Sequence, residues 1–257
     1  MDLGLRGRTA LVTGSTSGLG LAIARVLSRE HANVVITGRR AALAEQRAAE
    51  LTGAIGVGLD LVEPATTAAA VTRAAGTFGA IDVLVLNAGG PPPGPAAELT
   101  GMSMAESANV LLLAQIDLVS AVLPGMRERG WGRVLAIGSS GVQQPIPGLV
   151  RSNVARAGLA AYLKTLAAEV AADGVTVNML LPGRIDTGRV AALDADQAAR
   201  RGLPAESVRA RSEELIPAGR YGRPEEFADM AAFLCGDRAS YTTGAQIRVD
   251  GGLISGC

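Results

Sequence analysis

The sequence predicts an α/β fold, in which one doubly wound parallel sheet of about seven strands carries helices on both faces. Three observations predict this fold. Short apolar runs alternate along the chain with longer segments of helical periodicity. The apolar runs contain few polar residues, as in IDVLVLN at residues 81–87, which is typical of strands that are covered on both faces. The alternation of strand and helix also favours right-handed crossovers between parallel strands.

The expected strands are short and apolar, and they span residues 9–13, 33–38, 55–59, 81–87, 133–138, 175–181 and 245–249. The expected helices have apolar residues three and four positions apart, and they span residues 18–30, 41–51, 65–77, 102–129, 150–172 and 224–235. We expect Pro124 to bend or to end the long helix 102–129. Residues 184–220 are polar and show no strand pattern, so we expect a substrate lid or a disordered loop there.

Composition limits the class of protein. Lys plus Arg and Asp plus Glu both number 24, and this neutral balance is unlike that of a nucleic-acid-binding protein. Two cysteines and one histidine exclude a disulfide framework and a multi-histidine metal centre. No apolar run reaches about 18 residues, and the chain does not start with a signal-peptide pattern. We therefore expect one cytoplasmic domain over residues 1–257, without a metal, nucleic-acid or membrane partner.

A glycine-rich turn joins the first strand to the first helix. Glycines permit a tight turn and a close approach to a ligand, while the helix N-terminus offers free N–H groups to a phosphate. The strand–turn–helix context indicates a dinucleotide site, and the alternative is a turn that only needs small residues. The residues expected to contact the cofactor here are Gly14, Ser15, Thr16, Ser17, Gly18, Leu19 and Gly20.

The ends of the next strands extend this site. Arg39 and Arg40 follow the second strand, where a carboxylate would select NAD, and their guanidinium groups predict NADP(H). Alternatively, these arginines begin a solvated surface helix. We expect further cofactor contacts at the ends of the third and fourth strands, from Asp60, Leu61, Asn87, Ala88 and Gly89. A proline-rich loop follows, and Pro91 is expected to line the substrate pocket or to stiffen the connection.

From Leu5 to about Gly252, the chain resembles the short-chain dehydrogenase/reductase family, of the type represented by 3-oxoacyl-carrier-protein reductases. Besides the motifs above, the resemblance rests on residues 123–126, 132–134, 177–178, 182–183, 222–226, 243–244 and 249–252. It implies a Rossmann-type fold, a small-molecule substrate and a homotetramer built on the long helices. It also implies contacts with the nicotinamide from Pro182, Gly183, Ile185 and Thr187.

The resemblance implies a catalytic serine, tyrosine and lysine, and the chain departs from that set. Ser139 matches the serine. The tyrosine position, thirteen residues later, is Ser152, and the lysine position, four residues further, is Arg156. The family's asparagine position falls on Leu111. The nearest asparagine, Asn109, should face elsewhere unless the helix has a bulge.

None of the three tyrosines replaces the missing phenol. Tyr162 follows Ser152 by ten residues, which corresponds to about 15 Å along a helix. We expect Tyr221 to pack at the rim of the pocket and Tyr241 to be structural. Residues four apart share a helix face, so Ser152 and Arg156 should both point toward the cofactor.

Our leading hypothesis is an NADP(H)-dependent oxidoreductase that reduces a carbonyl at an altered active site. Ser139 and Ser152 would bind the carbonyl, and Arg156 would supply positive charge and bind the nicotinamide ribose. The proton would come from water or from a hydroxyl of a polyketide-like or other bulky ketone. The alternatives are a cofactor-binding protein without redox turnover, and a non-redox dehydratase, isomerase or cyclase.

Two further expectations concern the substrate. Gln143 and Gln144 follow the strand that carries Ser139 and are expected to contact it. Six arginines make the segment after residue 183 basic, namely Arg184, Arg189, Arg200, Arg201, Arg209 and Arg211. They suit an anionic or carrier-bound substrate, and they equally suit a solvated amphipathic helix.

Overall fold

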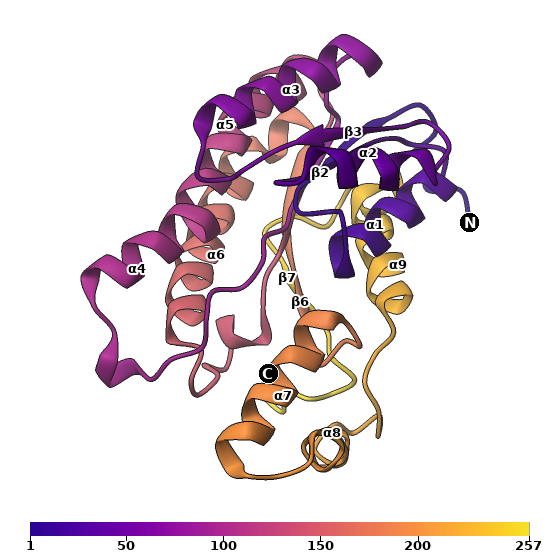
Figure 1. Cartoon of the computed structure of the whole chain (residues 1–257). Coiled ribbons are helices and arrows are strands. Elements are labelled where there is room, and N and C mark those ends of the chain that lie inside the picture. Colours follow the sequence, from indigo (N-terminus) through magenta and orange to yellow (C-terminus); the bar gives the residue numbers. More distant parts are fainter. Residues whose placement is uncertain (257) are drawn as a thin grey trace.

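Seven parallel strands form one sheet in the computed structural model, which describes residues 1–256 (Figure 1). Their order is β3-β2-β1-β4-β5-β6-β7, so the chain moves to one side of β1 and then to the other. The strands are β1 (Thr9–Val12), β2 (Asn33–Gly38), β3 (Ala54–Gly58), β4 (Val83–Leu86), β5 (Gly132–Ile137), β6 (Val175–Pro182) and β7 (Gln246–Val249). The predicted doubly wound α/β fold is confirmed.

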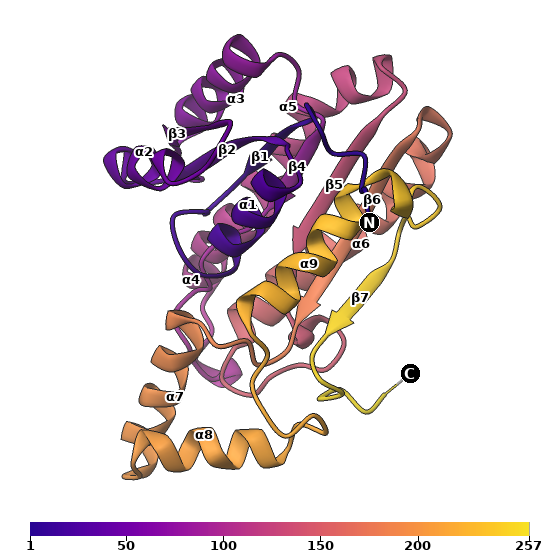
Figure 2. The same ribbon diagram turned by 90° about the vertical axis from the view of Figure 1, so that its right-hand side faces the viewer.

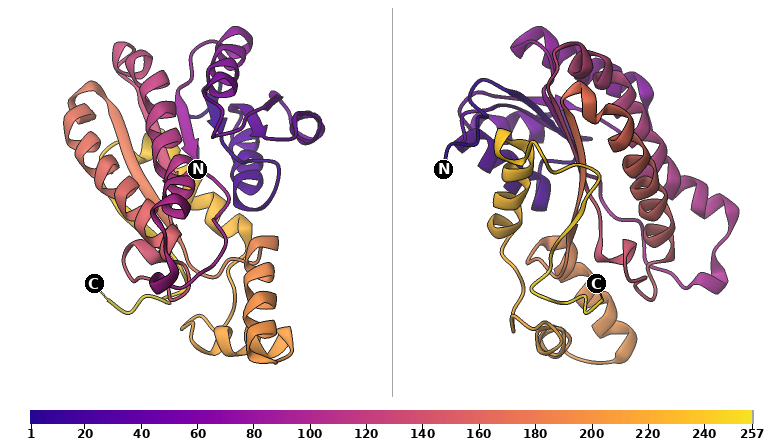
Figure 3. Two further views of the ribbon diagram at one scale, coloured as in Figure 1. Left: turned by 60° about the vertical axis from the view of Figure 1, so that its left-hand side comes forward. Right: turned by 180° about the vertical axis from the view of Figure 1, so that it is seen from behind.

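Helices cover both faces of the sheet (Figures 1 and 3). One face carries α1 (Gly18–Arg29), α2 (Ala41–Ala49) and α9 (Pro224–Cys235). The other carries α3 (Pro64–Phe78), α5 (Ala114–Glu128) and α6 (Val150–Val170). Single 3-10 turns occur at Ala96–Glu98, Ser140–Val142, Ala171–Asp173 and Asp237–Ala239. The helices follow the predicted ranges closely, because the apolar faces that predicted them are the faces that pack against the sheet.

Two apolar cores result from the alternation of side chains along each strand. In β4, Val83 and Val85 pack toward α1 and α9, whereas Leu84 and Leu86 pack toward α3 and α5. All four side chains are buried. A strand that is apolar at every position therefore contributes side chains to the apolar core on each face of the sheet, as its sequence predicts.

The predicted helix 102–129 is interrupted near its start. It consists of α4 (Gly101–Ala108), a π-helical turn (Asn109–Leu113) and then α5. Helix α5 continues through Pro124 to Glu128, so of the two expected effects this proline does not end the helix. An 18-residue window within the helical stretch Gly101–Glu128 has a mean hydropathy of 1.6, so by length and composition this stretch could cross a membrane. Its inner side chains, such as Leu118 and Met126, are buried in the apolar core on this face of the sheet.

The segment after β6 forms two helices, α7 (Gly188–Arg201) and α8 (Ala205–Glu214), which extend beyond the carboxyl ends of the strands (Figure 2). Most of the segment is therefore helical, and its role as a substrate lid remains a prediction. The buried carboxylate of Asp194 fixes α7 by accepting hydrogen bonds from Arg184 Nη1 (2.6 Å) and Tyr221 Oη (2.8 Å). Tyr221 is therefore a packing residue, as expected. Tyr241 is fully exposed, which does not support its expected structural role.

Candidate active site

The glycine turn between β1 and α1 has the backbone that its sequence predicts. Gly14 and Gly18 have φ values of +55° and +57°, a region that favours glycine. A Cβ at Gly20 would lie 2.5 Å from the Gly14 carbonyl oxygen, so only glycine lets α1 start this close to the turn. At Gly18 nothing lies within 4 Å of a Cβ, and this side of the turn faces solvent.

These donors fit a dinucleotide pyrophosphate. The first N–H groups of a helix have no partner within the helix, and the Ser17 side chain does not cap those of α1. They remain available for an anion, which the positive end of the helix dipole also attracts. Thr16, Ser17, Gly18 and Leu19 are at least partly exposed at this point. Arg39 and Arg40 are exposed beyond the end of β2, as a 2′-phosphate contact requires.

Two predicted cofactor residues, Ser15 and Asn87, form hydrogen bonds that hold the turn. Ser15 is fully buried; its N–H donates to the Thr37 carbonyl and its hydroxyl to the Val12 carbonyl, so it offers no donor to a ligand. The side-chain amide of Asn87 donates to the Gly14 carbonyl at 3.0 Å and so fixes the turn to the end of β4. The sequence could not distinguish these internal bonds from ligand contacts.

Asp60 and Leu61, on the adenine side of the predicted site, also form contacts within the fold. Asp60 and Leu61 follow β3 and are half-buried. The Asp60 N–H donates to Thr66 Oγ1, and the Leu61 side chain packs against the core beneath α3. Contact of Asp60 and Leu61 with the cofactor remains a prediction.

Ser139, at the end of β5, accepts a hydrogen bond from the Gly141 N–H at 3.1 Å. Gly141 lies between this serine and the first turn of α6. A Cβ added at Gly141 would collide with Oδ1 of Asn153, which lies in that turn. The tight turn therefore places Ser139 against the start of the helix that carries Ser152. The serine hydroxyl is half-buried and keeps its own proton for donation.

Arg156 is the most constrained charged residue of the site. Its guanidinium donates to three oxygens, namely Ile137 O at the end of β5, Ala88 O after β4 (3.3 Å) and Ser152 Oγ (3.3 Å). A guanidinium has more N–H groups than these bonds use, so donors remain for a ligand. Burial, and then the charge of Arg189, lowers the pKa of Arg156 to about 10. This value leaves the residue positively charged at neutral pH.

Ser152 is buried, and its oxygen accepts a hydrogen bond from Arg156 Nε. The bond uses an acceptor site of the hydroxyl and leaves its O–H free to donate. Because the donor is charged, the bond also polarises that O–H. The predicted pairing of residues 152 and 156 on one helix face is thus present, and it forms a donor supported by a cation.

The asparagine of the family set has no equivalent here. Leu111 is buried within the π-helical turn, whereas Asn109 is exposed. The bulge that could have redirected Asn109 therefore exists but does not turn it inward. The Gln115 side chain donates to the Val110 carbonyl at 2.9 Å, which satisfies a carbonyl near the turn.

Neither Tyr162 nor Tyr221 has the lowered pKa of a catalytic phenol. Burial, and then the charge of Glu169, raises the pKa of Tyr162. Burial is also the largest cause that raises the pKa of Tyr221, whose hydroxyl donates to Asp194. A catalytic phenol needs the opposite shift. These two tyrosines therefore do not supply a proton at neutral pH.

The segment after β6 is ordered along the edge of the site. Pro182 and Gly183 are half-buried, and a Cβ at Gly183 would lie 2.6 Å from the Asp250 Cα. Ile185 is buried in the core, so only its backbone could reach a nicotinamide. Thr187 caps α7 by accepting a hydrogen bond from the Val190 N–H at 3.4 Å. The nicotinamide contacts of this segment remain predictions.

The predicted substrate residues lie in exposed loops. Gln143 donates to Gln246 Oε1 at 3.4 Å, so its side chain is directed toward β7. Gln144 is exposed. The Pro91 carbonyl accepts a hydrogen bond from Arg189 Nη2 at 2.8 Å, a contact that the sequence did not reveal. Substrate contact by these three residues remains a prediction.

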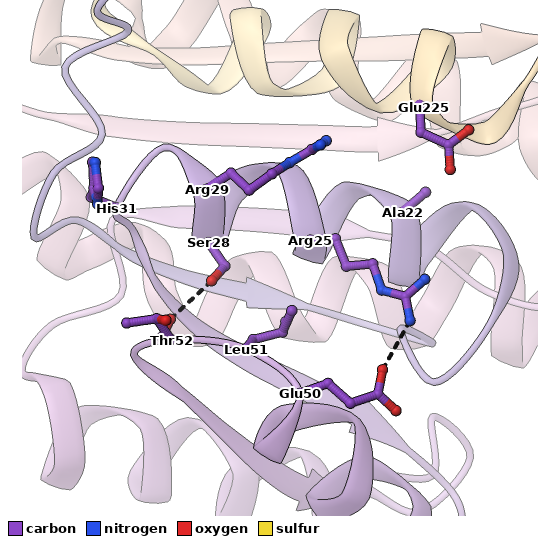
Figure 4. Close-up of a pocket in the computed structure, with 9 residues that line it drawn as sticks. All are labelled: Ala22, Arg25, Ser28, Arg29, His31, Glu50, Leu51, Thr52 and Glu225. Carbon is purple, nitrogen blue, oxygen red and sulfur yellow. Dashed lines mark hydrogen bonds and ion pairs between the residues drawn. The ribbon is translucent and has the colours of Figure 1, made fainter.

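A separate cavity of about 580 Å³ lies on the outer side of α1, between the end of α2 and the start of α9 (Figure 4). Arg25 and Glu50 form an ion pair of 2.9 Å in its wall. It does not include the glycine turn, Ser139 or α6. His31, expected on the surface, is exposed and is one of the residues that line the cavity. Cys235 is buried in α9 as expected, and the expectation that Cys257 is exposed lies outside the described residues.

Comparison with known proteins shows which family the chain belongs to. A family model described as enoyl-(acyl carrier protein) reductase matches residues 14–254. The chain is 35% identical to dehydrogenase/reductase SDR family member 4 of Sus scrofa, over 98% of this chain and 88% of that protein. It is 34% identical to the 3-oxoacyl-[acyl-carrier-protein] reductase FabG of Escherichia coli, over 98% of this chain and 99% of that protein.

Solved structures agree in fold. L-sorbose reductase from Gluconobacter frateurii, complexed with NADPH and L-sorbose, has a TM-score of 0.94 at 32% identity, with both chains fully covered. Actinorhodin polyketide ketoreductase with NADPH has a TM-score of 0.91 at 33% identity, covering 96% of this chain and 97% of that one. With its glycine turn, its sheet order and these relatives, the chain belongs to the short-chain dehydrogenase/reductase family of oxidoreductases.

Proposed function

We propose that this protein is an NADPH-dependent ketone reductase that works without the tyrosine–lysine pair of its family. The observation that carries the proposal is the bond from Arg156 Nε to Ser152 Oγ. It provides a polarised hydroxyl donor and a fixed positive charge at the positions that the phenol and the lysine would occupy. The cation is retained although the acid is lost, which favours a working site over a decayed one.

The residues of the glycine turn and the two arginines after β2 would hold the cofactor. The free N–H groups at the start of α1 would bind the pyrophosphate, and Arg39 and Arg40 the 2′-phosphate. The unused N–H groups of Arg156 would bind the nicotinamide ribose. When bound there, NADPH supplies the hydride that reduces the carbonyl carbon.

The protein's own contribution is orientation and charge stabilisation. Ser139 and Ser152 donate hydrogen bonds to the carbonyl oxygen and hold the carbonyl carbon toward the nicotinamide. As negative charge develops on that oxygen, the charge of Arg156 stabilises it through Ser152. The proton that completes the alcohol comes from water or from a hydroxyl of the substrate. A general acid commonly contributes about 10²–10⁴-fold in rate, so turnover without one is slow but feasible.

We propose a polyketide-like or other bulky ketone as substrate. Serine is much smaller than tyrosine, so position 152 leaves room above α6. A substrate with hydroxyl groups near the ketone could also supply its own proton. A polyketide ketoreductase and a sugar reductase among the structural relatives are consistent with such substrates.

We also propose a cytoplasmic homotetramer built on α4, α5 and α6. Apolar side chains project from these helices into solvent, with Leu113 49% exposed and Val154 50% exposed. Their burial between subunits would remove apolar surface from water. Light scattering coupled to size-exclusion chromatography measures the mass directly, and a monomer would contradict this part of the proposal.

The first experiment is a titration with NADPH and NADH, followed by turnover assays on a panel of ketones. We expect tighter binding of NADPH, and NADPH oxidation that matches alcohol formation one to one. Binding without oxidation would favour the cofactor-binding alternative. Product formation without oxidation would favour a dehydratase, isomerase or cyclase.

The second experiment tests the proposed role of Ser152. Ser152→Ala removes the polarised hydroxyl, and we expect kcat to fall by about 10- to 100-fold while NADPH affinity changes little. The matched control is Thr72→Ala, which removes an exposed hydroxyl on α3. An unchanged kcat in Ser152→Ala would refute the assignment.

A further inference from the structure

The six arginines of the lid segment differ in their partners. Three are held by carboxylates, namely Arg184 by Asp194 (2.6 Å), Arg200 by Asp196 (2.8 Å) and Arg209 by Asp186 (3.1 Å). Arg189, Arg201 and Arg211 have no carboxylate within ion-pair distance in the described part of the chain. Arg201 and Arg211 lie in the last turns of α7 and α8, whereas Arg189 lies in the first turn of α7.

Arg189 reaches the loop that follows β4. Its Nη2 donates to the Pro91 carbonyl at 2.8 Å, and a Cβ at Gly90 would lie 3.0 Å from the same nitrogen. Glycine at position 90 therefore lets the guanidinium lie directly against the loop backbone. The side chain is otherwise exposed, and a bond to one neutral carbonyl leaves most of its N–H groups free.

Arg156 contacts the same loop three residues earlier, at the Ala88 carbonyl. Two guanidinium groups, one from α6 and one from α7, thus flank residues 88–91 at the carboxyl end of the sheet. Neither group has a carboxylate partner within residues 1–256. Their mutual repulsion is strong enough that the charge of Arg189 contributes to the lowered pKa of Arg156.

Two unneutralised cations on either side of one loop create a local positive potential that an anion relieves. A guanidinium binds carboxylate or phosphate oxygens through paired N–H bonds, which are stronger than a bond to a neutral carbonyl. An incoming anion can therefore replace the Pro91 carbonyl as the partner of Arg189. Arg156 is buried and already bonded to the sheet, so Arg189 is the residue that can adapt to the substrate.

We infer that the ketone substrate carries an anionic group, a carboxylate or a phosphate, and that Arg189 recognises it. This inference rests on the proposed ketone reduction and deepens it. The ketone lies at Ser139 and Ser152, and its anionic group lies toward the lid between the 88–91 loop and the start of α7. Arg189 acts in substrate specificity and takes no part in the proton or hydride steps.

The test compares acids with their neutral counterparts in the full-length protein with NADPH. The probes are 2-oxobutyrate, 3-oxobutyrate and phenylpyruvate against their methyl esters, and dihydroxyacetone phosphate against dihydroxyacetone. We expect higher kcat/KM for at least one anion than for its neutral counterpart, and a KM for the anion that rises with salt. Whether the acids or the phosphate are preferred tells the two anionic groups apart.

The variant Arg189→Gln keeps the length of the side chain and removes its charge. We expect kcat/KM for the anion to fall by about 10- to 100-fold, mainly through KM, with the neutral ketone unaffected. Arg189→Lys should recover part of the loss. The matched control is Arg201→Gln, which removes an unpaired charge at the other end of α7. If Arg189 is only a latch between lid and loop, both substrates will lose activity equally, and the inference is overturned.

A binding measurement separates this inference from the proposed reaction. Saturation with NADP⁺ prevents reduction, so calorimetry can follow each ketone binding without turnover. Preferred binding of an anion that is lost in Arg189→Gln supports the inference even if no ketone is reduced in the assays. Equal binding of anionic and neutral probes, or an unchanged affinity in the variant, overturns it.

Discussion

The glycine turn at the start of α1 and the face of α6 that carries Ser152 and Arg156 lie at the same edge of the sheet, but different constraints fix them. In the turn, each glycine is fixed by backbone geometry, through a positive φ at Gly14 and Gly18 and a close approach at Gly20. On α6, the helix fixes only the direction of residues 152 and 156. Any side chain can occupy such a position without straining the backbone.

This difference bears on which positions of the proposed site can vary. A side chain at Gly20 would collide with the carbonyl of Gly14. Ser152 and Arg156, which we call the substituted face, stand on α6, where a change of side chain leaves the helix intact. The glycine turn therefore identifies the fold, whereas our proposal assigns the reaction and its rate to the substituted face.

The largest effect should come from the substituted face. Arg156→Met removes the cation and its bond to Ser152, and we expect kcat to fall by about 10²–10³-fold, because transition-state charge loses its stabilisation. Arg156→Lys should retain part of the activity. Steady-state kinetics and NADPH titration measure both variants. An Arg156→Met enzyme with native kcat would show that α6 contributes no chemistry.

The next effect tests the turn. Gly20→Ala places a methyl group against the Gly14 carbonyl, and overpacking of this kind destabilises by about 1–3 kcal/mol. We expect a lower free energy of unfolding and a loss of NADPH affinity of at least about tenfold. The control is Gly76→Ala on α3, where a Cβ meets nothing within 4 Å and helix propensity favours alanine. Urea denaturation and fluorescence titration measure the effects, and equal behaviour of the two variants would contradict the constraint.

A smaller effect concerns the choice of cofactor. Replacing both Arg39 and Arg40 by Ala should weaken NADPH binding by about tenfold and leave NADH binding nearly unchanged. Both side chains are exposed, so their contribution is screened by salt and the protein's stability should not change. The ratio of the two dissociation constants is the measurement. An unchanged ratio would mean that these arginines are solvated surface residues.

The smallest effect belongs to the scaffold and involves no catalytic residue. Burial in α9 raises the pKa of the Cys235 thiol to about 12 from an ordinary value of 9.0, because the thiolate would lose its hydration. In a Cys257→Ser background, iodoacetamide at pH 8 should therefore modify the native protein far more slowly than the urea-unfolded protein. Fast modification of the native protein would show that α9 opens readily.

The raised pKa of Cys235 also predicts how the free energy of unfolding depends on pH. Between about pH 9 and pH 12 the unfolded thiol loses its proton while the folded one keeps it, so this residue's contribution to stability falls as pH rises. Below pH 9 its contribution is constant. The difference between Cys235 and Cys235→Ala proteins in urea denaturation, measured across this range, isolates the effect. No pH dependence in that difference would contradict the raised pKa.

Much of the fold was predictable because it depends on patterns within single segments. An uninterrupted apolar run such as Val83–Leu86 must be covered on both sides, and the glycine spacing after β1 admits few backbones. The resemblance to the family placed Ser152 and Arg156 at the tyrosine and lysine positions, and the spacing of four residues predicted that they share a helix face. The boundaries of most elements followed from the same patterns.

The remaining features depend on residues that are far apart in the chain. The bonds of Ser15 to β2, of Asn87 to the glycine turn and of Arg189 to Pro91 join different segments, so no local pattern reports them. The pairing of the lid arginines likewise depends on which carboxylate each one meets. The sequence by itself determined the sheet, the glycine turn and the shared helix face of residues 152 and 156. Only the tertiary structure decided which polar groups are used inside the fold and which remain free for a ligand, because hydrogen bonds form between neighbours in space.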